Sequence, residues 1–185
     1  MQIVKFKPFS YAILVLRIIS PFFLFYDPFW VAIFLLFLDL IDTSFWMYSG
    51  FLKSKKQYQY IDKFLDWYYL TFLLIFSSQW NLPLLTYLYF FRVLGDIIVL
   101  ITKKEKLFIL FGNYFEPFYQ VYAFGITKSS DFLNYLNNNF FLIAAIIVIY
   151  KIGQEILLFG IKYENSLFRL GLAKEKYPET HISDS

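Results

Sequence analysis

The chain has 185 residues, of which 59% are hydrophobic and 24% aromatic, and its formal net charge is +3. A soluble domain of this length could not bury so much apolar surface, whereas a lipid bilayer solvates it directly. The sequence has no cysteine, and its single histidine, His181, lies in a polar tail, which excludes thiolate chemistry and disfavours a catalytic triad or a zinc site. The composition therefore predicts a polytopic membrane protein whose chemistry depends on carboxylates, Lys, Arg and hydroxyl groups.

Six apolar runs follow one another, each about as long as the 17 to 25 residues that cross a hydrocarbon core. The predicted spans are residues 10–26, 28–48, 61–78, 81–101, 107–125 and 139–161. Pro28 and Pro83 suit the first turn of the helices that they precede, and the polar link 127–139 has room for a short surface helix. The predicted fold class is all-α, a six-helix transmembrane domain over residues 1–163 with a basic tail over 164–185.

Lysines predict the orientation of these spans, because cytoplasmic loops of membrane proteins are enriched in Lys and Arg. Four links or ends on one side carry most of the basic residues, whereas Lys128 is the only lysine in the loops of the other side. Both termini are therefore expected in the cytoplasm of a multi-pass cell-membrane protein. The tail is expected to begin as a basic amphipathic helix on the inner leaflet and to end disordered. Because the basic residues form no single patch, nucleic acid is not an expected partner.

Four aspartates lie where a lipid-embedded segment should avoid charge, because an acid in a span costs about 2.5 to 3.5 kcal/mol. Asp39 and Asp42 are near the inner end of the second run, and Asp62 and Asp66 begin the third. Residues three or four apart share one helix face, so the hairpin can bring the two pairs together. Four carboxylates in one cleft would bind protons or hard divalent cations, although single acids at this depth also cap helices or pair with loop lysines.

This pattern resembles the signature of the CDP-alcohol phosphotransferases, which reads D-x-x-D-G-x-x-A-R, eight residues, G-x-x-x-D-x-x-x-D. The four acids match in order as Asp39, Asp42, Asp62 and Asp66. Arg17 followed by Pro21 is similar to the first helix of that family, and the expected helix count and inside termini agree with it. The motif resemblance covers residues 1–75, and the remainder of the chain resembles the family by topology alone.

Other positions depart from the signature. The family's Gly after the second acid is Thr43 here, its Ala is Trp46, its Arg is Met47 and its loop Gly is Tyr58. The interval between the second and third acids is also two residues longer than in the family. In the family the small residues make room for the cytidine nucleotide and the Arg lies near its phosphates. The metal-binding half of the signature is thus matched, and the nucleotide-recognising half is not.

The resemblance implies transfer of a substituted phosphoryl group from a CDP-linked lipid donor to an alcohol acceptor, with release of CMP, in phospholipid biosynthesis. It implies two Mg²⁺ or Mn²⁺ ions held by Asp39, Asp42, Asp62 and Asp66, with Asp66 also the catalytic base. Thr43, Trp46 and Met47 would then adjoin the donor at a site facing the cytoplasm, in a homodimer. Two alternatives remain open, namely a silent or donor-switched metal-binding homologue and a cation or proton transporter.

Further charges in the later runs have simpler interpretations. Arg92 is a candidate ligand for a substrate phosphate, but Asp96 lies four residues on and can neutralise it. Lys151 and Glu155 have the same spacing and are expected to pair, whereas Glu116 has no obvious local partner. Arg17 is expected to pair with an embedded aspartate or to extend toward the membrane surface.

Overall fold

The computed structural model describes residues 7–48, 55–102 and 104–156, and the side chains at positions 7, 40, 42–48, 55–59, 105 and 106 are outside that description. The α-helices are α1 Lys7–Ile19, α2 Pro28–Tyr48, α3 Lys55–Ser77, α4 Pro83–Thr102, α5 Phe115–Thr127, α6 Ser130–Asn138 and α7 Phe140–Glu155. Short 3₁₀ helices are η2 Ser20–Phe25, η3 Ser78–Trp80 and η4 Glu105–Ile109. Over the described residues the chain contains no strand, which confirms the all-α fold class.

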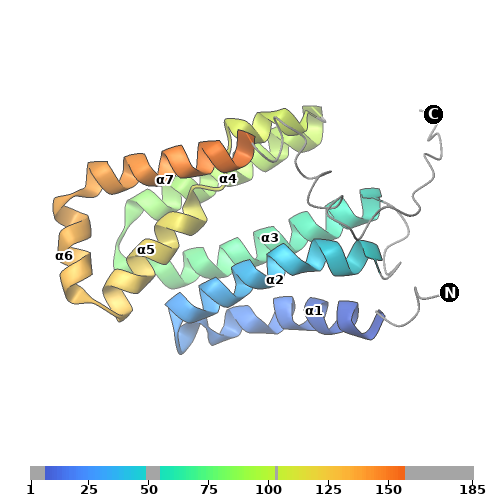
Figure 1. The fold of residues 1–185 in the computed structure, drawn as a ribbon, viewed down its shortest axis with the longest axis horizontal. Helices are drawn as coiled ribbons and strands as arrows, with labels where there is room; N and C mark the ends of the chain where they lie inside the picture. The colour runs from blue at the N-terminus through green and yellow to red at the C-terminus, as the bar shows by residue number, and fades with distance from the viewer. Residues whose placement is uncertain (1–6, 49–54, 103, 157–185) are drawn as a thin grey trace.

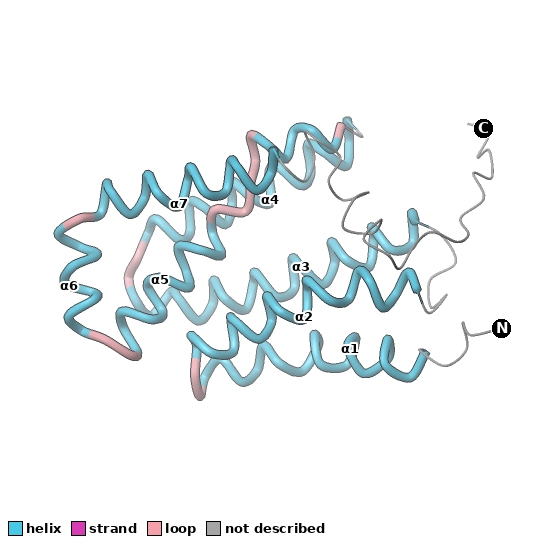
Figure 2. The backbone as a smooth tube through the Cα atoms, in the orientation of Figure 1, coloured by secondary structure: helices cyan, strands magenta, loops and turns pink. Residues whose placement is uncertain are grey.

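The helices form two groups that meet along their lengths (Figure 1). Helices α1, α2 and α3 lie side by side, α4 and α5 lie against them, and α7 packs on α5 and η4, with α6 across one end. We call the end where α1 and α3 begin the inner end, after the expected orientation, and the end where α2 and α4 begin the outer end. Figure 2 shows the turns into α2 and α4 and both turns of α6 at the outer end. Antiparallel α2 and α3 therefore place their acidic segments at the same, inner end.

Polar residues and prolines lie at the helix boundaries that the sequence predicts. Helices α2 and α4 begin at Pro28 and Pro83, since a proline at the first position sacrifices no helical hydrogen bond. Asp27 precedes α2, and its Oδ1 accepts a hydrogen bond from the backbone N–H of Trp30 at 3.2 Å, as an N-cap does. Asn81, with φ of 53°, turns the chain between η3 and α4. These local signals position the outer end of the bundle.

The fifth predicted span is wrong at its start. Residues 107–125 were expected to form one span, but α5 begins only at Phe115, after η4 and a turn. The side chain of Asn113 accepts a hydrogen bond from the backbone N–H of Glu116 at 3.3 Å, and Pro117 lacks the N–H that a longer helix would need there. With 13 residues, α5 is about 20 Å long, less than a hydrocarbon core.

The polar link before the last run forms α6, which Ser129 caps by accepting a hydrogen bond from the N–H of Phe132 at 3.2 Å. Helix α6 meets α7 at an angle of 89°, so it lies across the end of the bundle. The sixth predicted span, residues 139–161, matches α7 as far as the structure describes it. The tail, residues 164–185, lies outside the described residues.

Two described segments are long and apolar enough to cross a membrane, namely Pro8–Phe25 and α4, and the bent pair α6 and α7 makes a third if it is one span. Large apolar side chains also cover the outside of the bundle, as in Phe37, Ile101 and Phe141, which are 56%, 75% and 86% exposed. So many exposed apolar side chains suit lipid rather than water. The helical, membrane-associated class is therefore supported by the fold.

The hydrophobic core lies between α2, α3 and α5. Leu35, Leu70, Leu73, Phe115 and Tyr119 are all almost completely buried in it. On α2 and α3 these leucines lie one turn or more toward the outer end from the acidic residues. The main apolar core thus fills the outer half of the bundle, and a smaller cluster around Ile13 and Leu65 packs beside the acidic residues in the inner half.

Candidate functional site

Three of the four predicted acids converge between α2 and α3. One carboxylate oxygen each from Asp39, Asp62 and Asp66 lies within 4.8 Å of the other two. Asp62 and Asp66 are one turn apart on α3, and Asp39 faces them from α2, as the hairpin requires. The fourth acid, Asp42, lies on α2, but its side chain is outside the described residues.

The first helix contributes the central cation of this site. Arg17 on α1 is only 4% exposed, and its Nη2 lies 2.9 Å from Oδ1 of Asp39 and donates a hydrogen bond of 2.9 Å to Oδ1 of Asp66. Its Nη1 lies 3.5 Å from Oδ1 of Asp62. One buried guanidinium therefore serves three carboxylates from two other helices, which confirms that Arg17 pairs with an embedded aspartate.

A second cation closes the other side of the site. Lys63 donates a hydrogen bond of 2.9 Å from Nζ to Oδ2 of Asp66 and lies 3.9 Å from Oδ2 of Asp62. We call Arg17, Asp39, Asp62, Lys63 and Asp66 the acid cluster. Its three formal negative charges and two positive charges leave a net charge of −1. The cluster is thus largely neutralised by the protein itself and still has excess negative charge to attract a cation.

The donor set of the acid cluster fits a hard divalent cation. Carboxylate oxygens up to 4.8 Å apart approach the separation of two ligands on opposite sides of one ion, which is about 4 Å for Mg²⁺ and about 5 Å for Ca²⁺. Nη2 of Arg17, however, already contacts the oxygens of Asp39 and Asp66. A cation bound among these oxygens would therefore compete with the guanidinium of Arg17.

The residues that correspond to the nucleotide-recognising half of the signature are not described at the level of side chains. The last turns of α2 carry Thr43, Trp46 and Met47, but the side chains of these residues are outside the description. The same holds for the side chain of Tyr58 on α3. The structure therefore describes the acidic half of the predicted site and not the donor pocket.

A second ionic group lies beside the acid cluster on α4. Nη2 of Arg92 is 3.3 Å from Oδ1 of Asp96, so the expected pair is confirmed. Both side chains are buried, and each has a further partner, because Arg92 donates to the carbonyl of Phe111 at 3.1 Å and Trp67 donates from Nε1 to Oδ2 of Asp96 at 2.8 Å. Trp67 follows Asp66 directly on α3, and its hydrogen bond to α4 depends on tertiary packing that the sequence does not report.

An aromatic ring connects the two ionic groups. Nζ of Lys63 lies 5.4 Å from the ring centre of Phe108, and the guanidinium carbon of Arg92 lies 4.8 Å from it, so both cations contact the ring face electrostatically. Gly95 lets this linker lie close to α4, since a Cβ there would be 2.3 Å from Cβ of Phe111. The linker before α5 therefore contacts Arg92 twice, through the ring of Phe108 and through the carbonyl of Phe111.

Glu116 at the start of α5 extends the polar interior. Its Oε1 accepts a hydrogen bond from the hydroxyl of Tyr69 at 3.2 Å, and its Oε2 accepts one from the amide of Asn113 at 3.0 Å. The Asn113 contact was readable from the spacing of three residues, whereas Tyr69 arrives from α3. Both carboxylate oxygens of buried Glu116 therefore accept a hydrogen bond, and one of them comes from Tyr69, about one turn after Asp66 on α3.

The last helix carries the pair expected from its spacing. Nζ of Lys151 lies 3.9 Å from Oε1 of Glu155 and donates a hydrogen bond of 2.7 Å to Oε1 of Gln154. Both charged side chains are buried. Because Lys151 and Glu155 are satisfied within α7, they need no ligand to explain them.

Comparisons of this chain with protein-family models, with curated proteins and with solved structures found no match. The functional inference below therefore depends on the order of the acids in the sequence and on the geometry of the acid cluster. Chemically, this geometry offers hard oxygen ligands next to two cations that can pair with phosphate.

Proposed function

We propose that this chain is a divergent CDP-alcohol phosphotransferase that transfers a substituted phosphoryl group from a CDP-linked lipid donor to an alcohol and releases CMP. The observation that carries the proposal is the convergence of Asp39, Asp62 and Asp66 from two antiparallel helices. The same proposal includes a topology of six crossings with both termini and the site in the cytoplasm. It also includes a role in phospholipid biosynthesis.

The acid cluster is proposed to bind Mg²⁺ or Mn²⁺, with Asp42 completing the ligand set. Bound divalent cations would neutralise the donor diphosphate and so lower the barrier to displacement at phosphorus. Since a cation and Arg17 compete for the oxygens of Asp39 and Asp66, occupancy would free the guanidinium and the ammonium of Lys63. Both groups would then be available to pair with phosphate oxygens of the donor.

Asp66 is proposed as the general base. The acceptor oxygen forms a bond to the phosphorus that bears the lipid, the bond from that phosphorus to the bridging oxygen breaks, and CMP leaves with the electron pair. The proton of the acceptor hydroxyl goes to Asp66. Because both oxygens of Asp66 accept hydrogen bonds, from Arg17 and from Lys63, the carboxylate can take this proton only when one of them has been released.

Arg92 remains the proposed ligand for a substrate phosphate, with a condition that the structure makes clear. Its guanidinium is held by Asp96, by the carbonyl of Phe111 and by the ring of Phe108. A phosphate would have to replace Asp96 as its partner. Thr43, Trp46 and Met47 are proposed to shape a donor pocket that differs from the family's.

The proposal is tested by measuring CMP release from purified protein in nanodiscs. CDP-diacylglycerol and other CDP-alcohols are offered with a panel of alcohol acceptors, with Mg²⁺, with Mn²⁺ or with a chelator. Release should require the metal, and Asp62→Asn should lower it by at least about 100-fold, the scale of losing one essential group. Asp131→Asn, the same change at an exposed position on α6, should have no effect. Absence of metal-dependent release with every donor would overturn the proposal.

A second candidate is a silent or donor-switched metal-binding homologue. The observation that favours it is the neutralisation of the acid cluster by Arg17 and Lys63. These ion pairs stabilise the acids in the fold whether or not the protein catalyses a reaction. Metal binding by calorimetry that Asp62→Asn abolishes, without CMP release from any donor, would select this candidate. Metal-dependent cation flux in proteoliposomes would instead select a transporter.

A further inference from the structure

The first predicted span changes its helical form soon after the arginine of the acid cluster. Pro8–Phe25 is one apolar segment long enough to cross a membrane, yet α1 gives way to the 3₁₀ helix η2 at Ser20. Pro21 has no N–H to donate to the carbonyl of Arg17, and a proline also disfavours α-helical backbone in the residue before it. A 3₁₀ stretch within a helical segment often marks a hinge. We call Ser20 and Pro21 the α1 break.

On the outer side of the α1 break, η2 is fixed to α3. Leu24 of η2 is almost completely buried in the main core. The ring of Phe22 lies edge-on to that of Phe72, with ring centres 5.0 Å apart, and Phe25 lies edge-on to Phe76 at 5.7 Å. Edge-to-face pairs stabilise packing beyond the area that they bury. The chain just after the break is therefore anchored by apolar contacts.

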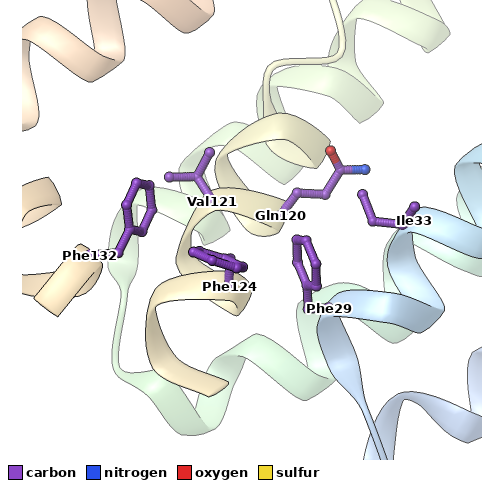
Figure 3. Close-up of a pocket in the computed structure, with 6 residues that line it drawn as sticks. All are labelled: Phe29, Ile33, Gln120, Val121, Phe124 and Phe132. Atoms are coloured by element: carbon purple, nitrogen blue, oxygen red, sulfur yellow. The ribbon is translucent and has the colours of Figure 1, made fainter. Parts of the chain in front are cut away.

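The start of α2, which follows η2, is anchored in the same way. The ring centres of Phe29 and Phe124 are 5.1 Å apart, and those of Phe124 and Phe132 are 5.2 Å apart, in T-shaped pairs that join α2, α5 and α6. Figure 3 shows these rings at a pocket of about 270 Å³ between the three helices. The pocket is lined by Phe29, Ile33, Gln120, Val121, Phe124 and Phe132. The outer end thus gives the first span a fixed base.

On the inner side of the α1 break, polar contacts have a larger share in holding α1 against α3. The main core includes no described residue of α1, which packs along α2 and contributes Ile13 to the smaller cluster with Leu65 of α3. Polar contacts with α3 include those of Arg17 in the acid cluster. They also include a hydrogen bond of 2.8 Å from the hydroxyl of Tyr68 to the carbonyl of Ile18. Arg17 is therefore a principal tie between α1 and the acidic face of α3.

A divalent cation in the acid cluster would remove this tie. It would bind the oxygens of Asp39 and Asp66 that Nη2 of Arg17 contacts at 2.9 Å. The guanidinium cannot stay beside the ion, because like charges repel strongly at short distance in a medium of low dielectric constant. Arg17 lies ten residues after Lys7, the first residue of α1, or about 15 Å along the helix axis, farther than its own side chain extends. Its charge therefore approaches water at the inner end only if α1 itself moves.

We propose that binding of a divalent cation at the acid cluster moves α1 away from α3, with the α1 break as the pivot, while η2 and the outer end stay in place. This motion presupposes the metal site of the proposed function and adds a conformational switch to it. Without a cation, Arg17 holds α1 against α3; with one, Arg17 is released together with α1. The motion opens the acid cluster on its α1 side, which gives a substrate access to the ions.

The test measures the position of α1 with spin labels, which is straightforward because the sequence has no cysteine. Cysteines are introduced in pairs at exposed positions, Ala12→Cys on α1 with Leu94→Cys on α4, and Phe23→Cys on η2 with the same Leu94→Cys. Double electron–electron resonance compares each pair in nanodiscs with Mg²⁺ and with a chelator. The mean distance between labels at positions 12 and 94 should change by about 2 Å or more with Mg²⁺, the scale of a helix shift. The distance between positions 23 and 94 is the matched control and should not change.

Two variants, each combined with the labels at positions 12 and 94, identify the cause of the motion. Arg17→Met should place α1 in the displaced position without metal, so Mg²⁺ should cause no further change. Pro21→Ala restores an N–H at the break and favours a continuous helix. It should reduce the change caused by Mg²⁺ and weaken Mg²⁺ binding about 2- to 10-fold, the worth of one backbone hydrogen bond. A change as large in Pro21→Ala as in the parent would overturn the pivot.

Calorimetry on the same labelled samples separates the motion of α1 from the metal site. Binding of Mg²⁺ without a change between positions 12 and 94 would overturn the motion and leave the metal site of the proposed function standing. Absence of Mg²⁺ binding would overturn both. An equal change in the two label pairs would contradict a pivot at the α1 break. If Arg17→Met does not fold, the two label pairs in the parent still decide the matter.

Discussion

The inner and outer ends of this bundle differ in how their charged side chains are paired. At the inner end, three carboxylates from α2 and α3 share one buried arginine from α1, and Lys63 adds a second cation. At the outer end, the ion pair between Asp27 and Lys128 joins two turns, and each of its side chains is 32% exposed. Around it the outer end consists of aromatic contacts.

The difference shows what burial demands of a charge. Removing an ion from water costs several kcal/mol, so a buried charge is stable only with several good partners. Arg17, which is 4% exposed, meets this demand with carboxylates from two other helices, of which Asp39 is itself 43% exposed. Asp27 and Lys128 keep most of their hydration and need only each other. The inner end should therefore depend strongly on its cations, and the outer end should depend mainly on apolar packing.

The largest effect is expected when the second ionic group is dissected. Arg92→Leu alone should cost about 3 kcal/mol, because among the described residues it leaves buried Asp96 with the Trp67 hydrogen bond alone. The double variant Arg92→Leu with Asp96→Leu removes both charges and should be more stable than Arg92→Leu. A double-mutant cycle on the free energy of unfolding measures this coupling. Additive losses would show that Arg92 and Asp96 do not stabilise each other, which would favour a ligand-binding role for Arg92.

A smaller effect is expected from the loss of the cation that the acid cluster shares. Arg17→Met should destabilise the protein by about 1 to 3 kcal/mol in a chelator, because it leaves the partly exposed carboxylates of Asp62 and Asp66 with Lys63 as their remaining described cation. Mg²⁺ should then stabilise the variant more than it stabilises the parent, since a metal ion and Arg17 occupy the same oxygens. The free energy of unfolding in mixed micelles, measured with and without Mg²⁺, checks both statements. Lys128→Met is the matched control at the outer end and should show neither effect. Equal stabilisation of parent and variant by Mg²⁺ would contradict competition between metal and guanidinium.

The smallest effect concerns the pair at the outer end. The hydrogen bond from Lys128 lowers the pKa of Asp27 below its ordinary value of 3.8. Folding therefore favours the charged form, so the contribution of this pair is complete above pH 3.8 and is lost as the pH falls through the lowered pKa. An exposed pair contributes about 0.2 to 1 kcal/mol, so Asp27→Asn should cost no more than this at pH 7 and less at pH 2. Thermal unfolding of parent and variant at both pH values tests the sign, which requires only that the loss be smaller at pH 2 than at pH 7; an equal or larger loss at pH 2 would contradict it.

Local sequence signals predicted several parts of the fold correctly. The prolines at 28 and 83 begin helices, and the spacings of Arg92 with Asp96 and of Lys151 with Glu155 form the expected pairs. These features depend on residues at most four apart, so their physics is contained in a short stretch of chain. The start of α5 could have been predicted in the same way from Asn113 and Pro117, but the apolar run obscured it.

Contacts between distant segments were not predictable in the same way. No spacing in the sequence pairs Tyr69 with Glu116 or Trp67 with Asp96, because each pair joins different helices. Nor did it indicate that Gln120 would have a buried amide in an apolar pocket. Such contacts depend on the rotation and crossing of helices, which hydropathy does not determine.

The sequence by itself determined that this is a helical, lipid-compatible chain with four acids in two helical pairs, since composition and residue spacing are enough for both conclusions. Only the tertiary structure decided which charges neutralise which. Asp39, Asp62 and Asp66 were expected to face one another, but the position of Arg17 among them depends on how α1 packs against the hairpin. The physical reason is that spacing along one helix sets a face, whereas the partner of that face is chosen by the packing of the whole bundle.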